Sequence, residues 1–381
     1  MVVFLADDLG AHELGCYGHP DHRTPNLDRL AEEGTRFETF WATPVCTPSR
    51  VLALTGQYPN QTGYYNFHGR KHAPIPGSEL GDVGRRLTFP DLLRDRGYAT
   101  ACAGKWQLTG ELPDLVHDCG FDTYRVWTWK HGLPEGVSHT GAFEAKDLPA
   151  RYRHPGLLED GALVDTAPDD WGPDLHADFL IRFMTENRDR PFLAYFPMSL
   201  IHTPWDPAPV PGKPGEFGDG GLAENVEAMD RIVGRVLDAL KVLGVEDRTL
   251  VVFTADNGTQ GAGKNTPTAR GVSVPLIVRW PGVVPEGVVS EALGELSDLF
   301  PTLAAAAGAS VPEDHHLDGV DQLPVWTGRQ SSVRDTITSF LGDRVLVRDA
   351  NWVLEGDGRL FEDRPGPSDA GPMLVLSLIH I

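Results

Sequence analysis

The sequence predicts an α/β protein with a large mixed, mainly parallel sheet sandwiched by helices. Short apolar runs alternate along the chain with helical patterns of about ten residues or more, and this alternation requires right-handed crossovers between parallel strands. The first run, Val2–Ala6, is apolar throughout, as expected of a strand buried on both faces. The 42 glycines and 31 prolines among 381 residues indicate many turns and long loops.

Each expected element is bounded by a turn or capping residue in the sequence. The opening strand ends abruptly at Asp7-Asp8-Leu9-Gly10, a turn signal. A helix is expected after Thr24, its N-cap, with Pro25 at the first helical position and Gly34 closing it. A strand over 36–41 follows, and Thr47-Pro48 opens another short helix. The later elements are helices near 89–96, 174–187 and 224–243 and strands over 99–103, 192–196, 250–254 and 274–278.

Two segments break this alternation. Residues 110–171 are rich in Gly, Pro, His and Trp, which predicts a loop-rich insertion over one edge of the sheet. Near the end of the chain, short strands over 336–340, 344–348 and 352–355 are joined by Gly/Asp turns. We therefore expect a main α/β domain over 1–310 and a small C-terminal antiparallel α+β subdomain over 311–381.

Composition excludes several classes of protein. With 41% hydrophobic and 23% charged residues, the chain as a whole is neither intrinsically disordered nor a coiled coil. The net charge of −21, without a basic stripe, argues against nucleic-acid binding. No run approaches the roughly 18 apolar residues that a membrane span needs. A structural zinc site is not expected, because no CxxC pair occurs among the four cysteines, Cys16, Cys46, Cys102 and Cys119.

Acidic residues follow two of the expected strands. Asp7 and Asp8 follow the first strand, and Asp256 and Asn257 follow the strand over 250–254. In open α/β sheets, ligands bind outside the carboxyl ends of the strands. Three carboxylates and an amide oxygen form a hard donor set that suits Ca²⁺ or Mg²⁺ better than zinc. The alternative interpretation is a helix cap at the first pair and a tight turn at Asp256-Asn257-Gly258.

One segment carries a recognisable motif. Cys46-Thr47-Pro48-Ser49-Arg50, followed by Leu52-Ala53-Leu54-Thr55-Gly56, resembles the signature of the type I, formylglycine-dependent sulfatases of the alkaline phosphatase superfamily. The resemblance implies that Cys46 is oxidised to formylglycine (3-oxoalanine), which hydrates to a geminal diol. One diol oxygen attacks sulfur, and the other collapses to the aldehyde and expels sulfate. The alternative is a buried structural cysteine before a Pro-initiated helix.

The resemblance covers most of the chain. Its landmarks are the opening Asp7-Asp8, the segment from Thr24, Gly104-Lys105-Trp106, His202-Thr203-Pro204 and Asp256-Asn257-Gly258. It implies that a calcium ion is held by Asp7, Asp8, Asp256, Asn257 and the modified Cys46. It further implies that Lys105 and Lys264 bind the sulfate oxygens and that His202 protonates the leaving alcohol. Arg50 is expected to stabilise the diolate from one helical turn beyond Cys46.

One residue departs from the family pattern. The family usually reads Gly-Lys-Trp-His, and this chain has Gln107 where that His is expected. We expect Gln107 to contact the substrate through hydrogen bonds, but an amide cannot act as a base at neutral pH. A nearby histidine could substitute for the missing one, and the candidates in the loops are His68, His72 and His131.

We therefore expect a sulfatase that hydrolyses an aryl or sugar sulfate to sulfate and the free alcohol. The alternatives are a phosphonate or phosphodiester hydrolase of the same superfamily and a catalytically impaired homologue that binds sulfate. A sugar ring could stack on one of four tryptophans in loop-rich regions, or these side chains could close small satellite cores. The four are Trp127, Trp129, Trp171 and Trp205.

The family resemblance has two further implications. A formylglycine-generating enzyme is expected to mature Cys46, and the protein is expected in the periplasm or outside the cell. No signal peptide is visible, and the first strand begins at Met1 itself. Because family members usually have residues before this strand, and because the tail 373–381 has no obvious partner, we expect a fragment at both termini.

Overall fold

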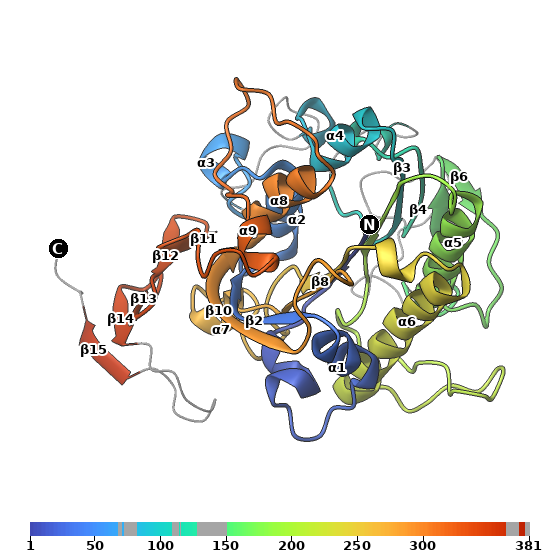
Figure 1. Cartoon of the computed structure of the whole chain (residues 1–381). Coiled ribbons are helices and arrows are strands. Elements are labelled where there is room, and N and C mark those ends of the chain that lie inside the picture. Colours follow the sequence, from blue (N-terminus) through green and yellow to red (C-terminus); the bar gives the residue numbers. More distant parts are fainter. Residues whose placement is uncertain are drawn as a thin grey trace.

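A ten-stranded sheet forms the centre of the molecule (Figure 1). The computed structural model describes residues 1–67, 71, 82–108, 114, 116–127, 151–362 and the backbone of 373–377. The strands of the sheet are β1 (Val2–Ala6), β2 (Thr35–Trp41), β3 (Ala99–Gly104), β4 (Thr123–Trp127), β5 (Leu157–Glu159), β6 (Ala162–Val164), β7 (Phe192–Pro197), β8 (Val251–Ala255), β9 (Leu276–Arg279) and β10 (Val288–Glu295). They lie in the order β10-β2-β9-β8-β1-β7-β3-β4-β5-β6.

The middle of this sheet is parallel, which confirms the predicted class. Strands β8, β1, β7, β3 and β4 are joined by parallel pairings, and every residue of β1 is buried. Antiparallel pairings flank this centre, β2–β9 and β8–β9 on one side and β4–β5 and β5–β6 on the other. The outermost pair on the first side, β10–β2, is parallel again. The sheet is therefore mixed, and the carboxyl ends of its central strands meet at one edge.

Helices cover both faces of the sheet (Figure 1). Helix α5 packs on α6 and α6 on α1 on one side, while α2 and α4 pack on α8 on the other. None of the helices in the described ranges is both long and apolar enough to cross a membrane. The helices are α1 (Pro25–Glu32), α2 (Cys46–Thr55), α3 (Pro59–Thr62), α4 (Phe89–Asp95), α5 (Gly172–Glu186), α6 (Leu222–Val242), α7 (Ala269–Val272), α8 (Leu299–Ala306) and α9 (Leu323–Trp326).

Local sequence signals explain where these helices start and which side they bury. Helix α4 begins with a capping box, in which Asp91 accepts a hydrogen bond from the backbone N–H of Thr88 at 3.0 Å. Along α6, apolar side chains recur every three or four residues and are buried, among them Val226, Met229 and Val233. Burial of this stripe, more than intrinsic propensity, stabilises so long a helix.

The segment 110–171 is more regular than the sequence predicts. It contains β4, which pairs in parallel with β3, and the short strands β5 and β6, which extend the same edge of the sheet. A loop-rich insertion over one edge of the sheet was predicted, and these strands within it were not, because β5 and β6 have three residues each, too few to show a period. The strand expected over 274–278 is β9, shifted towards the C-terminus and antiparallel to both neighbours.

A second, five-stranded sheet follows near the C-terminus and is antiparallel throughout, as predicted. A small core of Trp41, Val272 and Leu293 with Ile337 and Leu346 joins it to the first sheet. The division of the chain at residue 310 stays a prediction. The strands are β11 (Ile337–Leu341), β12 (Arg344–Arg348), β13 (Trp352–Leu354), β14 (Arg359–Glu362) and β15 (Met373–Ser377).

Candidate active site

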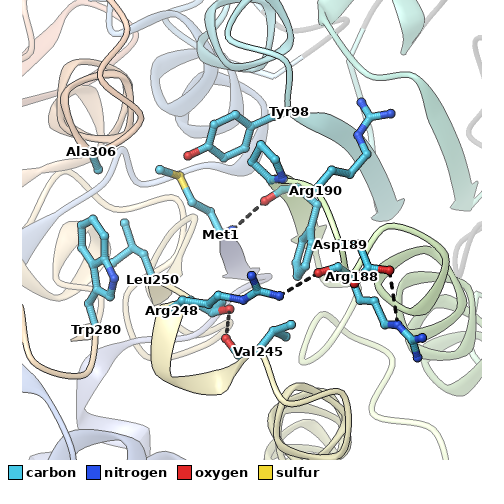
Figure 2. A pocket seen from close by; sticks show the side chains of 13 residues that line it. Met1, Tyr98, Arg188, Asp189, Arg190, Val245, Arg248, Leu250, Trp280 and Ala306 are labelled. Atoms are coloured by element: carbon cyan, nitrogen blue, oxygen red, sulfur yellow. Dashed lines mark hydrogen bonds and ion pairs between the residues drawn. The ribbon is translucent and has the colours of Figure 1, made fainter.

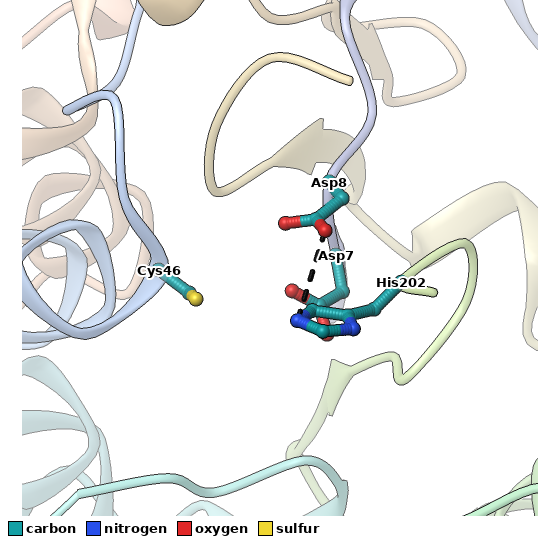
Figure 3. A group of neighbouring side chains, drawn as sticks. All are labelled: Asp7, Asp8, Cys46 and His202. Carbon is teal, nitrogen blue, oxygen red and sulfur yellow. Dashed lines mark ion pairs between the residues drawn. The ribbon is translucent and has the colours of Figure 1, made fainter. Parts of the chain in front are cut away.

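The carboxyl ends of β1, β3, β7 and β8 converge on one group of buried polar side chains. Asp7 and Asp8 leave the end of β1, and His202 follows β7. Figure 3 shows both carboxylates, the His202 imidazole and the Cys46 thiol facing a common centre. Their ligand atoms all lie within 4.8 Å of one another. Backbone hydrogen bonds align the strand ends, because Asp256 N–H donates to the carbonyl of Ala6 at 2.9 Å.

Helix α2 brings Cys46 to this centre. Cys46 is the first residue of the helix and is only 5% exposed. The hydroxyl of Ser49 accepts a hydrogen bond from the backbone N–H of Thr43 at 3.0 Å, which fixes the turn that leads into the helix. Gly56 ends the helix in the left-handed conformation with a φ of 65°. The short helix expected from Thr47-Pro48 therefore begins one residue earlier and points its N-terminus at the carboxylates.

Arg50, one turn further along α2, is fully paired. Its Nε and Nη2 donate to Oδ2 of Asp256 at 2.9 and 2.7 Å, and Nη1 donates to the carbonyl of Lys105 at 2.6 Å. A fixed fork of this kind orients a carboxylate as well as neutralising it. Arg50 thus contacts Asp256, and its Nη2 also lies 3.6 Å from Oδ1 of Asp7. The contact with Asp256 joins residues 206 positions apart, and the sequence did not reveal it.

Two lysines approach the first pair of carboxylates. The Nζ atom of Lys105 lies 2.6 Å from Oδ2 of Asp7, and Nζ of Lys264 lies 2.6 Å from Oδ2 of Asp8. Lys105 is completely buried. The three cations, Lys105, Lys264 and Arg50, thus formally balance Asp7, Asp8 and Asp256. Every one of these six residues was selected from the sequence, and the structure brings all six together.

The carboxylates do not titrate alike. Burial alone raises the pKa of Asp7, but Lys105 and the other nearby cations outweigh burial and hold that pKa well below its usual range. Burial and the charge of Asp7 raise the pKa of Asp256 to about 7 and also raise the pKa of Asp8. A divalent cation at the centre would therefore favour the ionised form of all three carboxylates.

The donor atoms fit a hard divalent cation. Oδ1 of Asp7 and Oδ1 of Asn257 are buried and have no hydrogen-bond partner, although buried polar atoms are normally paired. Both are oxygens of the kind that Ca²⁺ or Mg²⁺ prefers. Asp8 has a φ of 61°, a backbone conformation that costs about 1 kcal/mol or more for a residue with a side chain. The strained turn and the unpartnered oxygens both indicate a binding centre.

The imidazole of His202 is neutral in this arrangement. Its Nδ1 donates to the carbonyl of Thr203 at 2.6 Å, so the lone pair of the neutral ring is on Nε2, which lies 3.7 Å from Oδ2 of Asp8. Burial, and next the charge of Arg151, lowers the pKa of His202 well below its usual value. His202 is therefore oriented by Thr203 and presents one free nitrogen to the centre.

Gln107 lies beside Lys105 on the loop after β3. It is 6% exposed, has a φ of 53°, and its Oε1 has no hydrogen-bond partner. The structure thus leaves a buried amide oxygen free where the family motif has a histidine. The three histidines considered as substitutes, His68, His72 and His131, lie outside the described residues.

The tryptophans considered as sugar platforms are mostly covered. Trp127 and Trp171 are buried, and Trp205 is half-buried with its Nε1 donating to the carbonyl of Ile201 at 2.9 Å. Trp129 lies outside the described residues. Sequence reasoning missed Arg151 and Tyr152, whose segment packs on the loop that carries His202. No local motif marks them, because Tyr152 contacts residues about 50 positions away and Arg151 lies over the ring of Trp127, 24 positions before it.

A separate cavity of about 280 Å³ lies at the opposite, amino end of the strands. Met1, Phe192 and Leu250 contribute to it, together with three arginines, Arg188, Arg190 and Arg248 (Figure 2). Of the site residues predicted from the sequence, none lines this cavity. The predicted site residues that the structure describes therefore gather at the carboxyl edge.

A parallel sheet with buried carboxylates, lysines and a helix N-terminus at its carboxyl edge defines a hydrolase of the alkaline-phosphatase-like class. The family model described as Sulfatase matches residues 1–309. The chain belongs to the sulfatase family, and it is a sulfuric ester hydrolase.

Curated relatives are similar over most of the chain. N-acetylgalactosamine-6-sulfatase of Canis lupus familiaris is 34% identical, covering 91% of this chain and 69% of the relative. Arylsulfatase A of Homo sapiens is 33% identical, and the match covers 88% of this chain and 69% of the relative. Steryl-sulfatase of Mus musculus is also 33% identical, covering 86% and 65%. The chain thus spans about two thirds of the length of these relatives.

Solved structures agree with the fold. Ps i-CgsB superposes with a TM-score of 0.79 at 26% identity, covering 95% of this chain and 85% of that one. The structure of Ps i-CgsB in complex with k-i-k-neocarrahexaose gives a TM-score of 0.78, also at 26% identity. The match covers 94% of this chain and 85% of that one. A phosphonate monoester hydrolase of Agrobacterium radiobacter gives 0.67 at 20% identity, covering 95% and 88%, which is a likeness of fold alone.

Proposed function

We propose that this enzyme hydrolyses aryl or sugar sulfates with a formylglycine made from Cys46 and one Ca²⁺, with Mg²⁺ as the alternative ion. The observation that carries the proposal is the position of Cys46. Its thiol and the ligand atoms of Asp7, Asp8 and His202 all lie within 4.8 Å of one another. Cys46 also begins a helix whose Cys-Thr-Pro-Ser-Arg motif is intact. Chemistry at this residue would act directly at the proposed cation site.

Four residues would hold the cation beside Cys46, namely Asp7, Asp8, Asp256 and Asn257. The unpartnered oxygens of Asp7 and Asn257 support this assignment. When bound, a divalent cation supplies Lewis acidity and offsets the charge of the three carboxylates. Arg50 then serves to orient Asp256, since two of its nitrogens already donate to that carboxylate.

The modified side chain would supply the nucleophile, which an unmodified thiol with a pKa raised by burial cannot provide readily. Lys105 pairs with Asp7, and Lys264 pairs with Asp8. With the carboxylates occupied by a cation, both ammonium groups are free to donate to the oxygens of the sulfate group. These two residues would therefore bind and orient the ester.

His202 is proposed to deliver the proton to the leaving alcohol. The hydrogen bond from Nδ1 to the carbonyl of Thr203 fixes the ring. The neutral Nε2 would first take up the proton that the attacking hydroxyl gives up, and would then pass this proton to the oxygen of the leaving alcohol. Gln107 is proposed to hydrogen-bond the substrate through its free amide oxygen and amide group. Because an amide does not titrate near pH 7, any step that needs a base at this position is expected to be slow.

Other partners follow from the same proposal. A formylglycine-generating enzyme would act on Cys46 before the chain folds, because the residue is 5% exposed in the folded state. A periplasmic or extracellular location remains a prediction from the family. A phosphonate or phosphodiester hydrolase, or a silent sulfate-binding homologue, is the alternative function, and both are outcomes of the experiment below.

The experiment is co-expression with a formylglycine-generating enzyme, followed by assay of sulfate release from a panel of aryl and sugar sulfates. Wild-type protein is expected to release sulfate, and the Cys46→Ala variant should not. Aryl phosphonate monoesters and phosphodiesters are assayed in parallel, and hydrolysis of these substrates alone would favour the phosphonate or phosphodiester hydrolase. Binding of the sulfate esters without any release would identify the silent homologue.

A further inference from the structure

Arg151 is a buried cation beside the proposed active site that the mechanism above does not use. It is 4% exposed, and its Nε and Nη1 atoms have no hydrogen-bond partner. Among the described residues, no carboxylate lies within ion-pair distance of it. Arginine cannot shed its proton in a protein, so a charge is buried here without a direct ion pair in the described residues, although it acts at longer range on the half-buried carboxylate of Asp206.

This situation differs from that of the other buried cations at the site. Arg50 is paired with Asp256, Lys105 with Asp7 and Lys264 with Asp8. Burying a charge without a partner is unfavourable, and each of these three cations has a carboxylate partner within the protein. Of these four buried cations, Arg151 is the one that forms no ion pair within the described residues.

Neighbouring contacts hold Arg151 in place. Its guanidinium lies over the ring of Trp127, 4.5 Å from the ring centroid, and 5.9 Å from the ring centroid of Tyr152. Stacking of this kind fixes the plane of the guanidinium and directs its N–H groups along the edge of that plane, where Nε and Nη1 are buried. The N–H groups at that edge are the ones that lack partners. The side chain is therefore preorganised to bind a planar or tetrahedral anion.

The location of Arg151 relative to the chemistry follows from Tyr152. The hydroxyl of Tyr152 donates to the carbonyls of Ser199 at 2.7 Å and of His202 at 2.5 Å. The segment 151–152 is thus tied to the loop that carries His202. The charge of Arg151 also acts on His202, as the lowered pKa of that imidazole indicates. Arg151 accordingly lies on the side of the site where the leaving alcohol is expected.

We propose that Arg151 binds a second anionic group, a carboxylate or a further sulfate, on the alcohol portion of the substrate. This inference rests on the proposed function and narrows its substrate class to carbohydrates that carry an anion besides the scissile sulfate. Bidentate bonds from a guanidinium to either anion supply both affinity and orientation. A substrate that lacks the second anion leaves the guanidinium buried and unpaired, which is unfavourable.

The test compares substrates with one and with two anionic groups. The singly anionic probes are 4-nitrophenyl sulfate and a monosulfated neutral disaccharide. The doubly anionic probes are a monosulfated disaccharide that contains a hexuronate and a disulfated monosaccharide, which separate the carboxylate from the second sulfate. The measured quantity is kcat/KM for a doubly anionic probe divided by kcat/KM for a singly anionic probe. For wild-type enzyme this ratio is expected to be about ten or more with at least one of the two doubly anionic probes.

Two arginine variants form a matched pair. Arg151→Met should bring this ratio close to one, whereas Arg153→Met should leave it at the wild-type value. Arg153 is two residues away, but its side chain is 51% exposed and pairs with Asp169. A wild-type ratio near one, or an unchanged ratio in Arg151→Met, overturns the proposal. If Arg151→Met does not fold, the same ratio is measured for Arg151→Lys. This variant keeps the charge but loses the planar guanidinium, so its ratio must be lower than that of wild type.

A binding measurement separates this proposal from the proposed function. In the Cys46→Ala protein, which cannot turn over, calorimetric titration should show that the preferred doubly anionic probe binds about tenfold more tightly than its singly anionic counterpart. That preference should disappear when Arg151→Met is added. Lack of preference, or lack of any binding, counts against Arg151. By contrast, preferential binding with no sulfate release from wild-type enzyme would contradict the proposed function alone.

Discussion

The ammonium of Lys105 lies 2.6 Å from Oδ2 of Asp7, and neither side chain is exposed to solvent. Asp7 follows β1 and Lys105 follows β3, so this contact joins two strands that are separated by β7 in the sheet. The charge of Lys105 lowers the pKa of Asp7 and so keeps that carboxylate ionised. The pair thereby stabilises the carboxyl edge and prepares a carboxylate for the proposed cation.

Replacing Lys105 by Met should destabilise the protein and abolish turnover. The change leaves Asp7 buried beside other carboxylates, and loss of one partner of a buried pair costs about 3 kcal/mol or more. Sulfate release should fall at least about 100-fold, because a cation at the sulfate group is lost. Urea unfolding and a sulfate assay measure the two effects.

The double variant Lys105→Met/Asp7→Asn provides the control for this prediction. It removes both charges, so it should recover part of the lost stability but none of the activity. Lys213→Met, at an exposed surface pair, should change neither. Equal stability of wild-type and Lys105→Met protein would contradict the account of the pair.

Calcium should raise the midpoint of thermal unfolding by several degrees, because an ion that binds only the native state stabilises it by mass action. A chelator should reverse the shift. Asp8→Asn removes one of the proposed ligands and should weaken the calcium dependence, whereas Asp189→Asn should not, since that side chain is 91% exposed. A calcium response of equal size in Asp8→Asn and wild-type protein would argue against the proposed ligand set.

Gln107→His should increase turnover. The backbone at this position has a φ of 53°, which histidine tolerates better than most residues, and a general base contributes about 100-fold or more where one is needed. We expect kcat to rise at least about tenfold near pH 7, with a new pH dependence from the imidazole. Gln107→Asn is the control, because it keeps the amide. Unchanged kcat in Gln107→His would show that no base is required there.

His176 should make the fold sensitive to acid. It is buried in α5 near the ring of Phe196, with both ring nitrogens unpartnered. Burial, aided by the charge of Arg125, lowers the pKa of His176 to about 3. The unfolded chain takes up this proton near pH 6.5 and the folded chain does not, so the stabilising contribution is complete above pH 6.5 and declines as the pH falls towards 3.

The size of this effect at pH 5 is about 2 kcal/mol in the free energy of unfolding. Urea unfolding of wild-type and His176→Leu proteins at pH 7 and pH 5 measures it. The variant should lose less stability than wild type between these two values, by about that amount. Parallel pH profiles for the two proteins would mean that His176 is protonated in the folded state.

Much of the fold could be predicted because its central strands are short apolar runs bounded by turn residues. The strand at Val2–Ala6 is observed with the predicted bounds. Strand β10 was missed, because its first half is exposed and not apolar throughout, with Val289 52% accessible. The antiparallel direction of β9 could not be predicted either, since direction depends on where the chain returns in space.

The site was predictable for a related reason. Residues that follow parallel strands, such as Asp7, Lys105 and Asp256, must meet at one edge of the sheet, so their convergence follows from the topology. Contacts between distant side chains gave no such signal. The pairing of Arg50 with Asp256 and the isolation of Arg151 emerge only from packing, because neither residue carries a local pattern that reveals its partner.

The most direct test of the central claim is the mass of the tryptic peptide 37–50, which contains Cys46, after co-expression with a formylglycine-generating enzyme. We predict the mass loss expected when the thiol-bearing carbon becomes an aldehyde, and sulfate release from an aryl or sugar sulfate in proportion to the converted fraction. Full conversion with no sulfate released from any of these esters, accompanied by release of phosphate or phosphonate, would contradict the account.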